Sequence, residues 1–184
     1  MVSSLFTIIE HLAANIPQVR RINMSSQRTN SSTKCKIEFS EVFAEGTFKN
    51  VYAGTYTSGA SRGESCVWKQ FKAGSVYEDH YFDEELAIID RTQQIIDDFQ
   101  AAGIINHRIL INIPEIWYLT KTKALGLVEP MIENFEKFNS NTGWAPKSKN
   151  LWTDAMQALS HFSFHDSGGE LLLCDIQGGC YQDG

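Results

Sequence analysis

The sequence lacks several features that would place the chain in a membrane, outside the cell or on a nucleic acid. No apolar run approaches the roughly 20 residues that a membrane-spanning helix needs, and the N-terminus has no basic stretch typical of a signal peptide. The four cysteines have no C-x-x-C spacing, so we expect reduced thiols. The net charge of −6 argues against general binding to phosphate backbones, which requires clustered Lys and Arg. We therefore expect a soluble, cytoplasmic protein with no nucleic-acid and no membrane partner.

Familiar glycine-rich nucleotide motifs are also missing. The segment FAEGTFKNVYAG, residues 43–54, contains Gly46 but neither G-x-G-x-x-G nor G-x-x-x-x-G-K-[S/T]. Taken alone, it indicates the turn of a β-hairpin, and it is weak evidence for a loop that holds phosphate. There is also no internal repeat and no alternation of strands with helices.

The composition is that of a folded protein with a substantial core. The chain has 184 residues, of which 42% are hydrophobic and 11% aromatic, enough for one domain or for two small lobes that share a cleft. Residues 1–34 are expected to form a short N-terminal helix and a polar linker. The helix is predicted by apolar residues at helical spacing, namely Leu5, Ile8, Ile9 and Leu12.

The remaining chain, residues 35–184, has the pattern of an α+β fold. One long helix is predicted over 78–102 and a second one from residue 151. Strands are predicted from alternating or continuous apolar residues at 36–44, 50–57, 66–71, 113–120, 124–130 and 170–176.

A lysine lies inside one of these strands, in the segment CVWKQF. The side chain of Lys69 shares one side of the strand with Val67 and Phe71, where an ammonium group would lose its hydration unless it met an anion. One alternative is an edge strand from which Lys69 faces water. The other is a lysine that contacts nucleotide phosphates, with Glu84 or Glu85 of the following helix as its partner.

Three further positions are candidates for chemistry. Glu129 ends the strand ALGLVEP, either as a plain strand end or as a hinge where backbone groups contact an adenine edge. Asp175 and Gln177 lie two residues apart and would point the same way if the last strand continued through them. A carboxylate and an amide oxygen suit Mg²⁺. His161 on the second helix is a packed or solvated residue, or a metal ligand if other ligands come from elsewhere.

Five groups of segments occur in this order: FAEGTFK, VWKQF, VEPMIE with EKFNSNTG, ALSHFSF and GGELLLCDIQG. Taken together, they resemble the alpha-kinases. This family of atypical protein kinases includes the myosin heavy-chain kinases. The resemblance implies a two-lobed, protein-kinase-like fold with a mostly antiparallel N-lobe sheet over about 35–128 and a partial C-lobe over about 129–184. It also implies ATP-dependent phosphorylation of Ser or Thr in a protein substrate, with Mg²⁺ and a structural Zn²⁺.

The resemblance assigns a role to each candidate residue. Gly46 and Lys49 would belong to the glycine loop, and Lys69 would contact phosphate. Glu129 would mark the adenine hinge, and Asp175 and Gln177 would lie at the metal and the γ-phosphate. His161 would be the first zinc ligand.

The sequence departs from the family pattern in four ways. Lys49 stands where an arginine is expected, and the segment MIENFEKF lacks the usual hinge glycine. A Thr-Asp-Pro-like segment with a second aspartate would lie beyond Gly184, and so would the other three zinc ligands. We therefore expect zinc not to bind. The chain is expected to be either an incomplete kinase, a nucleotide-binding pseudokinase that transfers no phosphate, or a product that does not fold cooperatively.

Overall fold

The computed structural model describes residues 5–10, 27–46, 48–72, 78–120, 124–147 and 150–182. For 5–10, 78–81, 83–85 and 182 it describes the backbone alone. The chain divides into two compact units, which we describe separately. The β-rich unit comprises Arg28–Ala87 and Asn112–Met131, and the mixed unit comprises Met1–Gln27, Ile88–Ile111 and Ile132–Gly184.

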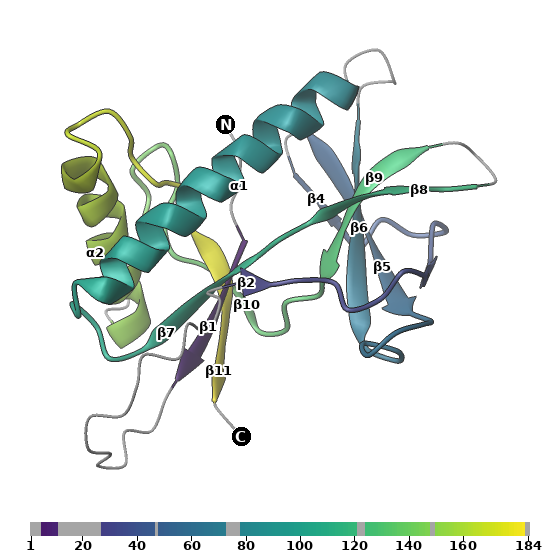
Figure 1. The fold of residues 1–184 in the computed structure, drawn as a ribbon, viewed down its shortest axis with the longest axis horizontal. Helices are drawn as coiled ribbons and strands as arrows, with labels where there is room; N and C mark the ends of the chain where they lie inside the picture. Colours follow the sequence, from purple (N-terminus) through teal and green to yellow (C-terminus); the bar gives the residue numbers. More distant parts are fainter. Residues whose placement is uncertain are drawn as a thin grey trace. The chain divides into compact units, whose positions relative to one another are not determined.

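The β-rich unit contains a six-stranded antiparallel sheet with the order β3-β5-β6-β9-β8, in which β4 also pairs with β5 (Figure 1). Its strands are β3 (Cys35–Ile37), β4 (Ala44–Glu45), β5 (Lys49–Tyr56), β6 (Ser65–Phe71), β8 (Glu115–Tyr118) and β9 (Leu125–Pro130). The predicted strands at 50–57, 66–71 and 124–130 are therefore confirmed to within one residue at each end. The strand predicted over 36–44 is interrupted, since residues 38–43 are not extended.

The two faces of this sheet carry different side chains because alternate residues of a strand point to opposite faces. One face holds a cluster around Tyr56, Cys66, Trp68 and Val128. The other face carries Val67, Lys69 and Phe71 of β6, and the Phe71 ring packs against Phe82 of the long helix at a centroid distance of 5.4 Å. This helix, α1 (Glu78–Ala101), runs from the β-rich unit into the mixed unit.

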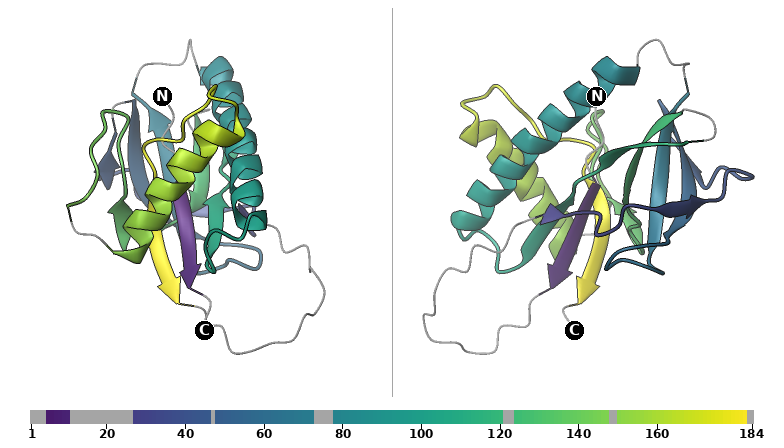
Figure 2. Two further views of the ribbon diagram at one scale, coloured as in Figure 1. Left: turned by 90° about the vertical axis from the view of Figure 1, so that its left-hand side faces the viewer. Right: turned by 45° about the vertical axis from the view of Figure 1, so that its right-hand side comes forward.

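The mixed unit contains a smaller sheet in which β10 (Phe135–Lys137), β11 (Gln177–Gln182), β1 (Leu5–Glu10) and β7 (Arg108–Asn112) are neighbours in that order. The pair β1–β11 is parallel and the other two pairs are antiparallel. Helix α2 (Leu151–Asp166) lies across β1 and β11 in Figure 2. The two-residue strand β2 (Gln27–Arg28) lies where the chain passes between the units.

Helix packing forms the core of the mixed unit. The rings of Phe99 on α1 and Phe162 on α2 meet at 5.3 Å. Helix α2 begins after Asn150, whose side-chain oxygen accepts a hydrogen bond from the Thr153 backbone N–H at 2.7 Å. This cap explains why the helix begins where the apolar pattern predicts it. Both predicted helices are confirmed.

Two elements differ from the sequence prediction. Leu5–Glu10 is a strand, so the N-terminal helix is wrong over these residues, and the rest of it lies outside the described residues. Pairing with β7 and β11 outweighs the helical spacing of a segment that contains the β-branched residues Thr7, Ile8 and Ile9. The last strand begins at Gln177, whereas 170–176 was predicted as a strand and is irregular.

The segment predicted as a polar linker is fixed to the β-rich unit where the structure describes it. The amide of Asn30 donates to the Val128 carbonyl at 2.8 Å, and Arg28 donates to the Met131 carbonyl at 3.0 Å. Among the described residues, no helix combines the length and the apolarity needed to cross a bilayer.

Candidate functional site

Lys69 and Glu129 form an ion pair in the β-rich unit. Lys69 of β6 pairs with Leu127 of β9, and Val67 pairs with Glu129, so Lys69 and Glu129 are diagonal neighbours on one face of the sheet. A long side chain can span such a diagonal. The Lys69 ammonium lies 2.6 Å from a Glu129 carboxylate oxygen.

This pair is largely removed from water. The exposed fraction of the side chain is 13% for Lys69 and 3% for Glu129. Each charge is therefore compensated mainly by the other, as expected for buried ions. The predicted partners Glu84 and Glu85 belong to residues whose side chains are not described, so a role for either stays a prediction.

The glycine loop is a hairpin between β4 and β5. The Gly46 backbone N–H donates to the Lys49 carbonyl at 2.8 Å, and Thr47 lies outside the described residues. The Lys49 ammonium lies 4.8 Å from the centre of the Phe71 ring, a cation–π contact. Lys72 contacts Glu45 at 2.5 Å and holds the pKa of this exposed carboxyl below its ordinary value. Two lysines therefore lie at the base of this loop, Lys49 at the start of β5 and Lys72 directly after β6.

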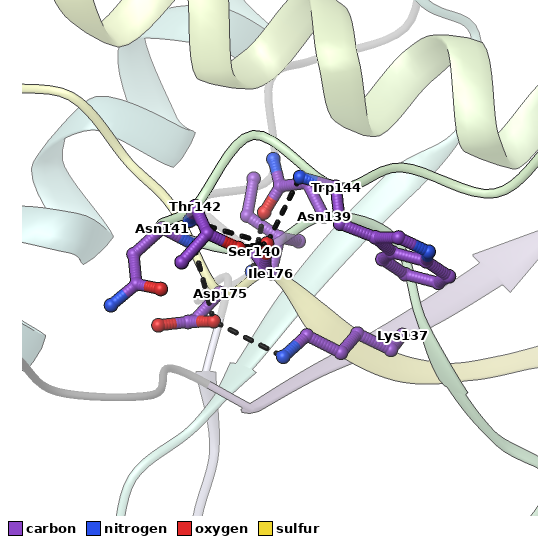
Figure 3. Close-up of polar contacts among 8 residues, drawn as sticks. All are labelled: Lys137, Asn139, Ser140, Asn141, Thr142, Trp144, Asp175 and Ile176. Carbon is purple, nitrogen blue, oxygen red and sulfur yellow. Dashed lines mark hydrogen bonds and ion pairs between the residues drawn. The ribbon is translucent and has the colours of Figure 1, made fainter.

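A second ion pair lies in the mixed unit. The carboxylate of Asp175 contacts the Lys137 ammonium at 3.2 Å and accepts a hydrogen bond from the Asn141 backbone N–H at 3.4 Å (Figure 3). Asp175 adopts φ = +56°, a left-handed conformation that occurs infrequently outside glycine. The prediction that Asp175 and Gln177 lie on one extended strand is therefore wrong, because the backbone turns at Asp175 and β11 begins only at Gln177.

The position of Asp175 is fixed by the hydrogen bonds of the next residue, Ile176. The backbone N–H of Ile176 donates to the side-chain oxygen of Asn139 at 2.8 Å, and the Ile176 carbonyl accepts from the Phe138 N–H at 2.8 Å. Ile176 and Asn139 are both buried. These two hydrogen bonds form a clamp that attaches the segment before β11 to the segment after β10 (Figure 3). Lys137 is the last residue of β10.

His161 lies on the exposed side of α2. Its Nε2 atom is 3.1 Å from the Nε2 atom of His165, one turn later on the same helix. The described residues include no group of three or more His, Cys, Asp or Glu that could hold a metal ion. Two imidazoles do not provide the four ligands of a structural zinc site, so the donor set described around His161 does not fit that role.

The structure thus brings together Lys69 with Glu129, and Asp175 with a residue that the sequence reasoning missed. That residue is Lys137, in the segment EKFNSNTG. The available signal was a lysine followed by several amide and hydroxyl side chains. Asp175, the partner of this lysine, is 38 positions away, and only the fold shows that the two meet. Gln177 begins β11, where its backbone pairs with Lys137 and Leu5.

Comparison with known proteins places these positions in one family. The sequence profile of the alpha-kinase family matches residues 44–183, which is most of the chain. The chain belongs to the alpha-kinase family. All candidate site residues of this alpha-kinase lie inside the matched range, and the resemblance that the motifs predicted is confirmed. No protein among the curated sequences matches the chain.

Solved alpha-kinase structures have a similar fold. The C-terminally truncated alpha-kinase domain of myosin heavy chain kinase has a TM-score of 0.66 at 19% identity, over 81% of this chain and 74% of that one. The alpha-kinase domain of myosin-II heavy chain kinase A in complex with AMP-PNP has a TM-score of 0.67 at 20% identity, over 82% and 72%. An inactive form complexed with ATP gives 0.63 at 19%, over 82% and 73%. These matches confirm the α+β, two-lobed alpha-kinase fold.

Proposed function

We propose that this alpha-kinase transfers the γ-phosphate of ATP to Ser or Thr residues of a protein substrate. The observation that carries the proposal is the buried pair of Lys69 and Glu129, in a chain that belongs to a kinase family. A buried ammonium group on a strand is costly without a function or a partner, and phosphate groups are anions that it can bind. Two solved relatives of this fold contain ATP or its analogue AMP-PNP.

In this proposal, β6, β9 and the hairpin between β4 and β5 each have one task in binding ATP. Lys69 holds phosphate oxygens, with Glu129 keeping its ammonium in place through the 2.6 Å contact. The backbone around Glu129, next to the last residue of β9, contacts the adenine edge. Gly46 and Lys49 cover the phosphates from the hairpin between β4 and β5. The β-rich unit then corresponds to most of the predicted N-lobe, residues 35–128.

Asp175 is the metal-binding residue of the proposal, with Gln177 as a second oxygen ligand. A single carboxylate suits Mg²⁺, which retains several waters and bridges to phosphate. Bound Mg²⁺ would neutralise charge on the transferred group. Lys137 and Asn141 hold the carboxylate in place, and the clamp between Ile176 and Asn139 fixes the backbone next to it.

A second candidate function is nucleotide binding without phosphate transfer. The contact between Lys137 and Asp175 favours it, because a carboxylate that is already neutralised by a lysine attracts a cation less strongly. Both functions predict ATP binding, and they differ in whether phosphate leaves ATP.

Thermal shift measurements with Mg²⁺ and ATP test the binding step. ATP should raise the Tm of the chain, and Lys69→Met should abolish this rise. Lys36→Met is the matched control, because it removes an exposed lysine that contacts Glu38 at a similar distance, 2.7 Å, in the same sheet. If Lys69→Met and Lys36→Met respond to ATP equally, Lys69 does not bind phosphate.

Transfer of labelled γ-phosphate to a Ser/Thr peptide library tests the catalytic step. A kinase should label the library, and Asp175→Asn should lose this activity by about two orders of magnitude or more, since one positioned charge is worth that much in phosphoryl transfer. ATP-dependent stabilisation without labelling in the unsubstituted chain would instead support the non-catalytic function. Absence of both would contradict the nucleotide site itself.

A further inference from the structure

Two of the four free cysteines lie on the same face of the sheet in the β-rich unit. Cys66 of β6 is completely buried, and Cys35 of β3 is half-buried and packs against the cluster that contains Cys66. The strands β3 and β6 are not neighbours, because β5 lies between them. Residues of these two strands nevertheless approach to within 8 Å between Cα atoms, closer than the two strand spacings of a flat sheet.

A glycine on the middle strand leaves room for side chains from the two outer strands to meet. Gly54 of β5 pairs with Ile37 on one side and with Cys66 on the other. A Cβ atom at position 54 would lie 2.4 Å from the Cδ1 atom of Ile37 and 3.1 Å from the Cys66 sulfur. The next residue on the same face, Tyr56, pairs with Cys35. Cys35 and Cys66 therefore lie diagonally on one face of the sheet, with β5 between their strands, and both belong to the cluster on that face.

The two thiols interact and differ in acidity. The neighbouring Cys66 side chain lowers the pKa of Cys35 below its ordinary value, against the opposing effect of burial. The Cys35 side chain and burial both raise the pKa of the Cys66 thiol. Since the thiolate is the nucleophile of cysteine chemistry, Cys35 is the member of the pair that reacts first.

We propose that Cys35 and Cys66 form an oxidation-sensitive pair, in which a peroxide converts the two thiols into a disulfide between β3 and β6. The Cys35 thiolate attacks one peroxide oxygen, the O–O bond breaks, and the departing oxygen takes a proton to leave as water. Cys35 is then a sulfenic acid. The Cys66 sulfur attacks the Cys35 sulfur, the S–O bond breaks, and the leaving hydroxide takes the Cys66 proton. Overall, two thiols and one H₂O₂ give one disulfide and two waters.

The disulfide would connect an edge strand to a central strand of the sheet. It closes a loop from residue 35 to residue 66, and such a crosslink stabilises a fold mainly by restricting the unfolded chain. The site lies on the sheet face opposite to Lys69, because Cys66 and Lys69 are an odd number of residues apart on β6. It is thus a modification site separate from the proposed nucleotide contacts.

Peptide mapping after treatment of the full chain with H₂O₂ tests this proposal. The number of free thiols should fall from four to two, with the disulfide found between the peptides of Cys35 and Cys66, and dithiothreitol should restore all four. The oxidised chain should also show a higher Tm than the reduced chain. The absence of this disulfide, or a disulfide that involves Cys174 or Cys180 instead, would overturn the proposal.

Variants separate the two steps. Cys66→Ala keeps the site apolar and should trap Cys35 as a sulfenic acid that a dimedone probe labels, whereas Cys35→Ser should prevent both labelling and disulfide formation. Cys180→Ser is the matched control and should leave the Cys35–Cys66 disulfide unchanged. Iodoacetamide should modify Cys35 well before Cys66 at a fixed pH. Equal rates at the two thiols, or no dimedone label in Cys66→Ala with a native circular dichroism spectrum, would contradict the mechanism.

Discussion

The ion pair of Lys69 and Glu129 makes a quantitative prediction about stability. At a separation of 2.6 Å, two unit charges attract each other by about 6 kcal/mol at an effective dielectric constant of about 20. Removing the two ions from water costs several kcal/mol each, which offsets most of this attraction. Loss of one partner leaves the other charge buried and uncompensated. We therefore expect Lys69→Met and Glu129→Leu each to lower the free energy of unfolding by about 3–5 kcal/mol.

The double variant should be much more stable than the sum of the single effects predicts. Lys69→Met combined with Glu129→Leu replaces a buried ion pair by two apolar side chains, a change that is often neutral. We expect the double variant to lie within about 1 kcal/mol of the original chain and the coupling energy to reach about 3 kcal/mol or more. Urea denaturation without nucleotide measures all four free energies, provided that the m-values agree.

An exposed ion pair in the same sheet is the control. Lys36 and Glu38 meet at 2.7 Å, but their side chains are 73% and 60% exposed. Water screens such pairs, so Lys36→Met should change stability far less than Lys69→Met does. Single effects of similar size at Lys36 and Lys69, or additive effects of Lys69→Met and Glu129→Leu, would refute the argument that burial determines the strength of this pair.

Two further predictions concern the β-rich unit. Gly126→Ala should destabilise the protein by about 1–3 kcal/mol or more in urea denaturation, because a Cβ atom there would lie 2.2 Å from Cε2 of the buried Trp68 ring. Gly46→Ala, where a Cβ would lie 3.6 Å from the Lys49 backbone oxygen, should have an effect below about 0.5 kcal/mol. In NMR titration, the pKa of Glu45 should lie below its ordinary value of 4.5, and Lys72→Met should return it there. Since this folded-state pKa is lowered, any stability from the pair is present above pH 4.5 and is lost as the pH falls through the folded pKa; an unshifted Glu45 would contradict the contact.

The sequence predicted the β-rich unit well because its local signals agree with its tertiary pairing. The strand SCVWKQF alternates apolar residues on both faces, and the structure extends β6 over the whole of it. The identification of Lys69 as an unusual residue also followed from this pattern. Its partner could not be predicted, because Glu129 becomes a diagonal neighbour only through the register of β6 and β9.

Prediction failed where strand pairing or backbone turns outweigh local preference. Leu5–Glu10 has helical apolar spacing, yet it pairs with strands that begin only at Arg108 and Gln177. The run ELLLCDI is as apolar as a buried strand, but the positive φ of Asp175 and the hydrogen bond from Ile176 to Asn139 place the extended backbone after it. No local pattern encodes either constraint.

Both proposed functional carboxylates are neutralised by lysines from a neighbouring strand. Glu129 is held by Lys69 in the β-rich unit and Asp175 by Lys137 in the mixed unit. Neither lysine therefore leaves an unpaired positive charge in the ligand-free protein. In the proposed function, Lys69 contacts phosphate and keeps Glu129 as its partner, while Asp175 would hold Mg²⁺. The phosphates of ATP carry more negative charge than one lysine compensates, so nucleotide binding should depend on the metal that neutralises the rest. ATP without Mg²⁺ should therefore raise the Tm much less than the two together, and an equal rise in the presence of EDTA would show that Asp175 and a metal ion take no part in binding.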